Sequence, residues 1–178
     1  MSDSNIAEPT GEESVEHARR VERTALTIYG AMTLLGVLEA ATTKAVVDST
    51  AALVILIVAT SLAIVIAHAW STVVAHRLVD GEELSSHRVG NELWFAGSFL
   101  VPAILALVTV LIAGTLTSHD TSILLAQGVL LVFLFIAGIT GARRGGASWG
   151  RSIAWGVVDI AVGLAIVLIK ETLSLFAH

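Results

Sequence analysis

The sequence predicts an all-α, polytopic membrane helix bundle with five transmembrane helices, a cytoplasmic N-terminus and an external C-terminus. The first reason is charge spacing: no Asp, Glu, Lys or Arg interrupts the 28 residues between Asp48 and Arg77. The same holds for the 27 residues between Glu92 and Asp120 and for the 22 between Asp120 and Arg143. Because the hydrocarbon core of a bilayer is about 30 Å thick and a helix rises about 1.5 Å per residue, each stretch is long enough to cross it.

Composition is the second reason. The chain of 178 residues is 55% hydrophobic and only 14% charged, whereas a soluble domain carries about 25% charged residues. It contains no cysteine, which excludes disulfides, thiolate metal sites and a cysteine nucleophile. No basic stripe runs along the chain, so we expect no nucleic-acid partner.

Residues 1–23 form a polar N-terminal tail and juxtamembrane segment. The first 15 are polar and acidic and lack the apolar region of a signal peptide, so we expect a disordered, solvated tail. The alternative is a helix that starts at the capping-box pattern of residues 10–13 and runs through Arg19, Arg20 and Arg23. The solvated tail is the favoured interpretation, because the capping pattern is common by chance.

The membrane domain covers residues 24–178, and its first and last spans are the weaker ones because each carries an interior charge, Glu39 and Asp159 respectively. The third span contains Pro102, whose missing N–H predicts a kink that neighbouring helices tolerate. Glycines Gly128, Gly138 and Gly141, in the fourth span, are predicted packing sites. The five predicted spans are residues 24–43, 49–74, 93–115, 121–141 and 152–173.

Orientation follows from the Lys and Arg residues, which concentrate on the cytoplasmic side of membrane proteins. Only Lys44 and Lys170 fall on one predicted side. The N-terminus is therefore expected in the cytoplasm and the protein in the cell inner (plasma) membrane as a multi-pass protein. The arginines on the opposite, cytoplasmic side are Arg19, Arg20, Arg23, Arg77, Arg88, Arg143, Arg144 and Arg151.

Two ionisable side chains lie deep in predicted spans, where a charge costs about 2.5–3.5 kcal/mol on insertion scales. Counted from Arg77 and Arg151, His68 and Asp159 both lie about 12–13 Å from the cytoplasmic boundary. An imidazole and a carboxylate at one level can ligate a divalent metal or relay a proton. The alternative is a structural His–Asp hydrogen bond that holds two spans together, and both interpretations stay open.

Helical spacing places further polar side chains on faces that we expect to line a transport pathway with His68 and Asp159. Glu39 and Lys170 both fall near the outer face and are expected to form a structural ion pair. The expected pathway residues are Tyr29, Met32, Glu39, Ser71 and Thr72.

Two cytoplasmic loops carry charge. The acidic loop at residues 80–88 lacks the spacing of a defined calcium site and is expected to be solvated. The alternative is weak metal binding by Asp80, Glu82, Glu83 and His87. The basic, glycine-rich loop at residues 141–151 is expected to bind anionic lipid head groups through Arg143, Arg144 and Arg151.

Enzyme signatures such as G-x-S-x-G and H-E-x-x-H are absent from the sequence, so we expect no enzyme and no cofactor. The hydroxyls of Ser71 and Thr72 are expected to bond their own helix backbone. The first functional hypothesis is a transporter or channel for a cation, either a divalent metal carried as substrate or a proton-coupled ion. The second is a non-transporting scaffold or partner subunit. Because five short helices make a thin bundle, a homo-oligomer is expected in either case.

The segment FLFIAGITGARRGGASWGRSIAWGVVDIAVGLAIVLIKETL (133–173), together with the five-span layout, resembles the vacuolar iron transporter family. The stretch AHAWS (67–71) stands where that family has a Gly-Glu-Tyr-Val-Ser-like segment, so the resemblance puts His68 at the position of a functional glutamate. It implies metal transport. Two departures are clear: residues 28–33 lack the carboxylate of the family's first-span motif, and the family's long acidic insert is reduced to residues 80–92.

Overall fold

The computed structural model of the chain describes residues 11–43, 47, 49–80 and 86–176, and all regular structure in these ranges is helical. The longest helix precedes the others and a short 3₁₀ turn, η1, interrupts the middle of the chain. In chain order the elements are α1 (Gly11–Thr43), α2 (Thr50–Asp80), α3 (Ser86–Ala96), η1 (Gly97–Phe99), α4 (Leu100–Leu116), α5 (His119–Arg144) and α6 (Trp149–Phe176).

Five helical stretches are long and apolar enough to cross a membrane: Ser14–Thr42, Thr50–Val79, Glu92–Leu116, His119–Arg144 and Trp149–Ile169. Large aliphatic side chains cover their outer surfaces; Ile55, Ile66 and Leu124, for example, are each more than 60% exposed. A water-soluble monomer rarely exposes so much continuous apolar surface. The predicted class, an all-α multi-pass membrane protein with five spans, is confirmed.

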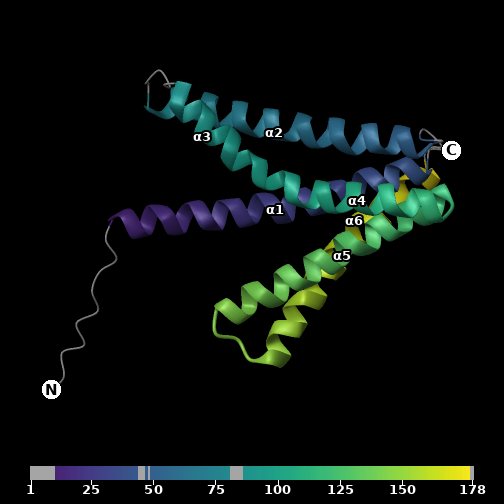
Figure 1. Cartoon of the computed structure of the whole chain (residues 1–178). Coiled ribbons are helices and arrows are strands. Elements are labelled where there is room, and N and C mark those ends of the chain that lie inside the picture. Colours follow the sequence, from purple (N-terminus) through teal and green to yellow (C-terminus); the bar gives the residue numbers. More distant parts are fainter. Residues whose placement is uncertain (1–10, 44–46, 48, 81–85, 177–178) are drawn as a thin grey trace.

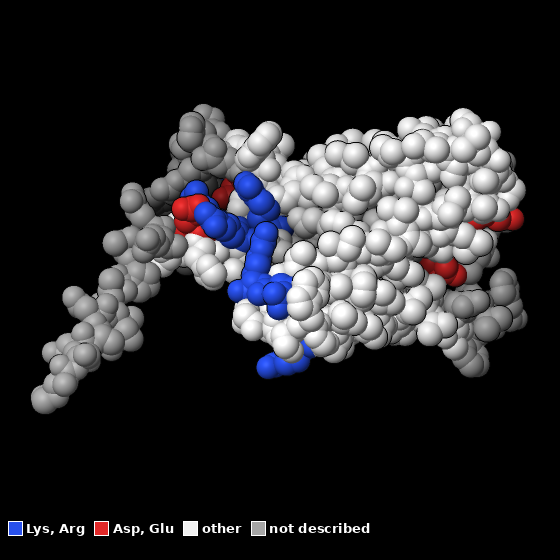
Figure 2. All heavy atoms as spheres, turned by 60° about the horizontal axis from the view of Figure 1, so that its bottom comes forward, with Lys and Arg blue, Asp and Glu red and all other residues white. Residues whose placement is uncertain are grey.

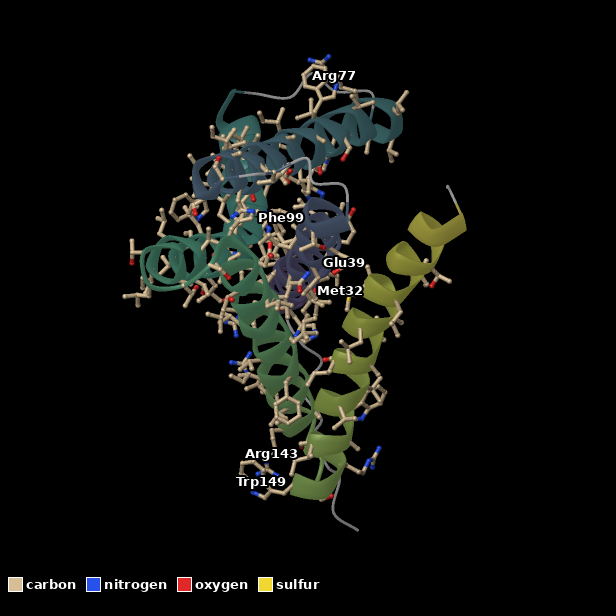
Figure 3. All side chains as sticks on the ribbon, turned by 90° about the vertical axis from the view of Figure 1, so that its right-hand side faces the viewer. Met32, Glu39, Arg77, Phe99, Arg143 and Trp149 are labelled. Atoms are coloured by element: carbon tan, nitrogen blue, oxygen red, sulfur yellow. The ribbon has the colours of Figure 1, made fainter. Side chains whose placement is uncertain are left out.

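Helix α1 is the centre of the bundle and contacts every other described helix. Figure 1 shows it running between α2 and α3 on one side and α5 and α6 on the other, and the end-on view of Figure 3 shows the same order. Three buried leucines of α1, Leu34, Leu35 and Leu38, form the middle of the apolar core. The other helices contribute Leu53, Ile57, Val110, Leu130 and Leu134 to it.

Helix α2 buries one residue in every four: Leu53, Ile57, Ser61, Val65, Ala69 and Val73. Because a helical turn takes 3.6 residues, a spacing of four makes the buried stripe drift around the helix by about 40° per step. One half of α2 therefore packs into the main core with α4, and the other half into a small second cluster with Ala96 and Phe99.

The third span is broken rather than straight, and the kink predicted at Pro102 takes the form of η1, which separates α3 from α4. Pro102 is the third residue of α4, where its missing N–H costs no intrahelical bond. Gly30 of α1 makes room for this corner, because a Cβ at Gly30 would lie 3.0–3.1 Å from Phe99 and Pro102.

The favoured expectation of a solvated tail is wrong from Gly11 onward, because α1 begins there and runs unbroken into the first span. Residues 14–25 are exposed, yet helical. Once the apolar span has formed a helix, each added residue contributes one more backbone hydrogen bond without a new nucleation step. An i,i+4 ion pair between Arg20 and Glu16, 2.5 Å long, adds to this extension. The predicted capping residue, Thr10, lies outside the described residues.

The start of α1, the end of α2 and the α5–α6 turn lie at one end of the bundle (Figure 1). Figure 2 shows the basic side chains of the visible face gathered at that end. This arrangement is the one on which the predicted cytoplasmic N-terminus depends; the side of the membrane itself stays a prediction.

Candidate functional site

A cavity of about 360 Å³ lies between α1, α2 and the α3–η1 corner. Its apolar wall includes Leu26 and Phe99, and its polar wall is formed by Tyr29, His68 and Ser71. The cavity exists because α2 has few contacts with α1 and packs instead on α3 and α4. It is the place where the largest number of the predicted pathway residues meet.

His68 is the most unusual side chain of this cavity. Its Nε2 atom is buried and has no hydrogen-bond partner among the residues that the structure describes. Buried side-chain nitrogens are nearly always bonded to protein or to water, and a single water needs only about 10–15 Å³ of such space. The adjoining cavity has room for several waters, so the imidazole lies beside a space that can hydrate it.

The hydroxyls next to His68 are committed to their own helix. Ser71 Oγ and Thr72 Oγ1 both donate to the carbonyl oxygen of His68, at 2.8 and 3.1 Å. This confirms the predicted backbone bonding of both side chains. Ser71 still forms part of the cavity wall, whereas Thr72 is half-buried.

Tyr29 lines the opposite wall, and its ring centre lies 6.3 Å from that of Phe99, tilted by 57°. The ring is 57% exposed, so it borders the mouth of the cavity. Met32, one turn further along α1, packs against the main apolar core instead (Figure 3). Met32 is therefore not among the residues that line this cavity, because the i+3 position has turned toward the core leucines.

The cavity lies closer to the basic end than the depth counted from Arg77 suggested. His68 shares it with Leu26 and Tyr29, which follow Arg23 by three and six residues and so lie about 5–9 Å beyond it. Counting from Arg77 gives a greater depth for His68, because α2 continues beyond the level of the cavity as far as Asp80.

Asp159 lies elsewhere, against α5. A Cβ at Gly138 would overlap the Asp159 carboxylate and would lie 2.9 Å from the Cα of Gly156. The structure does not bring His68 and Asp159 together, because α1 runs between α2 and α6 (Figures 1 and 3). A shared depth was not enough to predict a shared site: Asp159 fills a notch between α5 and α6.

Glu39 has a partner that the sequence did not suggest. Its carboxylate accepts a hydrogen bond of 3.1 Å from the Gln127 amide, which joins α1 to α5 in the outer half of the bundle. The expected partner, Lys170, has a side chain outside the described part of the structure. The sequence does contain a signal for Gln127, because it is the only Asn or Gln within the five predicted spans. Side-chain amides within a membrane form hydrogen bonds across helices.

The fourth span's glycines differ from one another. Gly138 is a packing site, as predicted, but Gly128 and Gly141 face open space, since a Cβ there would meet nothing within 4 Å. Another missed residue is His119 at the outer end: its Nε2 lies 3.1 Å from the Val47 carbonyl oxygen, and its Nδ1 is buried and unpartnered in the described structure.

The α5–α6 turn closes with a Schellman motif in which Gly146 has φ +76°. Arg143 is part of this turn: it donates to the Ala147 carbonyl oxygen at 2.8 Å and stacks over Trp149 at 4.7 Å (Figure 3). Its guanidinium therefore holds the turn, in addition to any lipid contact. Arg144 and Arg151 are exposed beside it.

The described residues contain no group of three or more His, Cys, Asp or Glu side chains that could hold a metal ion. The acidic loop, with Asp80, Glu82, Glu83 and His87, was the other predicted metal-binding candidate; its side chains lie outside the described residues.

The chain matches no protein-family model, no curated protein and no solved structure. Its function therefore has to be inferred from its own residues.

Proposed function

We propose that this protein moves a cation across the membrane, and that the proton is the ion that its geometry suits best. The observation that carries the proposal is the buried Nε2 of His68, which has no partner among the described residues and lies beside a cavity of about 360 Å³. Ionisable groups within spans are rare and mark ion or proton pathways more often than they serve other roles.

The choice of the proton over a divalent metal depends on the number of donors. A metal such as Zn²⁺ takes three or four protein ligands, and the described residues of the cavity wall offer one imidazole and no carboxylate. A single imidazole is sufficient to relay a proton, because one ring nitrogen can accept a proton while the other gives one up.

The cavity is closed toward the outer side by packed side chains. Beyond Val65, the buried stripe of α2 continues with Ser61 and then with Ile57 and Leu53. The last two share the main core with Leu34 and Leu38 of α1. A transported ion would have to pass this layer, so we infer that the structure represents a state open toward the basic end only. Alternating access would separate α1 from α2 at these leucines.

The resemblance to the vacuolar iron transporter family supports the same cavity. The stretches at residues 28–33 and 67–71, which correspond to two motifs of that family, supply Tyr29 and His68 to opposite walls. Metal transport is therefore the second cargo to test.

A scaffold or partner subunit is the second candidate function. It is favoured by Asp159, which fills the notch at Gly138, and by the Glu39–Gln127 hydrogen bond. In both places a polar side chain serves helix packing. Under this function His68 would also matter only for stability.

Two further proposals concern the setting of the protein. We propose the cell inner (plasma) membrane with the basic end in the cytoplasm, following the arginine distribution. We also propose a homo-oligomer, in which a second copy covers the exposed face of Tyr29. Light scattering of the detergent-solubilised protein would measure the oligomeric state.

Reconstitution tests the main proposal. Purified protein in liposomes that contain a pH-sensitive dye should acidify the interior under an imposed K⁺ diffusion potential, faster than protein-free liposomes. Parallel liposomes with a divalent-metal indicator test Mn²⁺ and Fe²⁺. Flux of a metal without a proton would replace the proton by the metal as cargo. If no ion moved and His68→Ala only lowered the melting temperature, the scaffold function would be the correct one.

A further inference from the structure

Two cavities at the basic end of the bundle share two residues, Arg23 and Trp94. The first, about 380 Å³, lies between the start of α1 and α3. The second is a groove of about 760 Å³ that runs from the same two residues along α2 and the α3–η1–α4 segment. Because they share a wall, one elongated molecule can occupy both.

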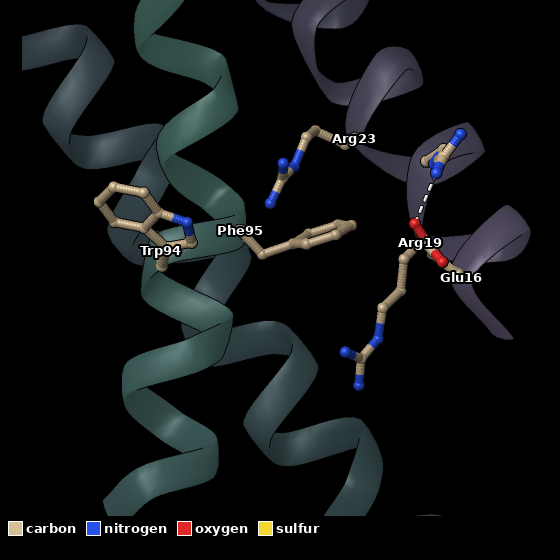
Figure 4. A pocket seen from close by; sticks show the side chains of 6 residues that line it. Glu16, Arg19, Arg23, Trp94 and Phe95 are labelled. Carbon is tan, nitrogen blue, oxygen red and sulfur yellow. Dashed lines mark hydrogen bonds and ion pairs between the residues drawn. The ribbon is translucent and has the colours of Figure 1, made fainter. Parts of the chain in front are cut away.

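The first cavity is positively charged. Its charged residues are Glu16, Arg19, Arg20 and Arg23, and Figure 4 shows Arg19 and Arg23 extending from α1 on either side of Phe95. Arg20 pairs with Glu16 at 2.5 Å, which neutralises one arginine. Arg19 and Arg23 add two more guanidinium groups one helical turn apart, and guanidinium groups bind phosphate oxygens in a bidentate manner.

Aromatic side chains fix the position of this charged cavity. The guanidinium of Arg23 lies 5.3 Å from the ring centre of Phe95 (Figure 4), a cation–π contact that orients it. Trp94, at the junction of the two cavities, is 80% exposed. An exposed indole next to arginines is typical of the head-group level of a membrane.

The second cavity is apolar along most of its length. Below Arg23 and Trp94 its walls are Leu62, Val65, Leu93 and Leu100, which belong to spans exposed to lipid. Leu62 and Leu93 are each about half exposed, at 49% and 48%. The groove therefore continues from the arginines into the hydrocarbon layer.

We propose that these two cavities form one binding site for an anionic phospholipid of the leaflet at the basic end. The phosphate binds Arg19 and Arg23, and one acyl chain lies in the groove between Leu62 and Leu100. A soluble phosphate would leave the groove empty, and a neutral lipid would not use the charge of the arginines. The groove shares Val65 with the wall of the His68 cavity, but the proposed lipid site does not depend on the proposed transport function.

Native mass spectrometry of the full-length protein in mild detergent tests this site. Titrated phosphatidylglycerol should remain bound at least tenfold more tightly than phosphatidylcholine with the same acyl chains. Inorganic phosphate and glycerol phosphate, at the same concentrations, should neither bind nor displace the lipid. Equal affinity for the two lipids, or displacement by either soluble phosphate, would overturn the proposal.

Variants locate the lipid. Arg19→Gln and Arg23→Gln should each weaken phosphatidylglycerol binding about tenfold, which corresponds to one charge-assisted contact. Leu62→Trp narrows the groove without changing its charge and should weaken phosphatidylglycerol binding to a similar degree. The control is Arg77→Gln, an exposed arginine on α2 at the same end of the bundle, outside both cavities, which should stay within twofold of the wild type.

Two results would contradict the location. If Arg77→Gln lost as much phosphatidylglycerol binding as Arg19→Gln and Arg23→Gln, only the general charge of this end would attract the lipid. Unchanged binding in both Arg23→Gln and Leu62→Trp would mean that the lipid binds elsewhere. Since Arg19, Arg23 and Leu62 are all exposed, these substitutions leave the buried core unaltered.

Discussion

The α1–α2–η1 region and the α5–α6 pair each carry an ionisable side chain deep in an apolar span, His68 and Asp159 respectively, but the surroundings of the two side chains differ. In the first region His68 borders a cavity and its Nε2 is buried without a partner in the described structure. In the second, Asp159 fits into the notch at Gly138 with Gly156 beside it. The α5–α6 pair also packs on α1, so the contrast lies in the immediate neighbours of His68 and Asp159.

Two features of the neighbouring helix explain the contrast: the size of the residues at the helix–helix contact, and whether that helix is continuous. Helices α5 and α6 approach closely because glycines stand at their contact, Gly138 on one helix and Gly156 on the other. Helix α2 instead faces a partner broken at η1, and the broken segment leaves space beside His68. An ionisable residue in a span therefore indicates an ion pathway only where the packing around it leaves room for water.

The largest effect is expected on proton flux, when His68 and Asp159 are replaced one at a time by neutral side chains. His68→Ala should lower proton flux in liposomes at least tenfold, because it removes the imidazole from the described wall of the cavity. Asp159→Asn keeps the shape of the packed side chain and should retain most of the flux. Dye-monitored acidification of liposomes with equal protein content measures both. Loss of flux in Asp159→Asn with normal flux in His68→Ala would reverse the roles assigned to the two regions.

The next largest effect concerns stability. Gly138→Ala should lower the free energy of unfolding by about 1–3 kcal/mol, since its Cβ would overlap Asp159 and the backbone of Gly156. Gly128→Ala is the matched control on the same helix: its Cβ meets nothing within 4 Å, and the better helix propensity of Ala should leave stability equal or slightly higher. Thermal unfolding in detergent ranks the two variants; a Gly138→Ala protein as stable as Gly128→Ala would disprove the packed notch.

A smaller effect is expected in the outer half of the bundle. Gln127→Leu removes the donor to Glu39 and should cost about 0.6 kcal/mol, the average for a hydrogen bond between membrane helices. Glu39→Gln keeps an acceptor at the same position and should cost less. Steric-trapping measurements of unfolding in bicelles have the required precision. If Glu39→Gln proved the more damaging change, its negative charge rather than this hydrogen bond would hold α1 to α5.

The smallest effect is expected from the hydroxyls beside His68. Ser71→Ala and Thr72→Val remove bonds to the carbonyl of their own helix, so we expect changes within about 0.5 kcal/mol of stability. Proton flux should also stay within twofold. A tenfold loss of flux in Ser71→Ala would make that hydroxyl part of the pathway.

The number of spans could be predicted from sequence because bilayer thickness fixes the length of each apolar stretch. The kink at Pro102 and the backbone bonds of Ser71 and Thr72 were also predictable, since each depends on local geometry. The helical start of α1 was not, because the apolar span that nucleates it follows it in the chain.

The site was harder to predict than the fold. Counting residues gives the depth of a side chain along its helix but not its position around the bundle. The sequence therefore predicts a common level for His68 and Asp159, but it does not show that α1 separates them. The cavity itself depends on Phe99 and on the break at η1, which lie about 30 residues away from His68. Such a contact has no signature in either segment alone.

Thiol labelling at two adjacent positions tests the hydrated cavity most directly, and the natural absence of cysteine makes a single introduced thiol readable. Ala67 lies on the exposed rim of the cavity, whereas Ile66, the next residue, is not among the cavity's lining residues and is 62% exposed on the outside of the bundle, where we place lipid. A charged, membrane-impermeant reagent reacts with thiolates, which form in water and not in hydrocarbon. Ala67→Cys should react from the basic side at least tenfold faster than Ile66→Cys. Equal rates at both positions, or no reaction at Ala67→Cys, would contradict a water-filled cavity beside His68.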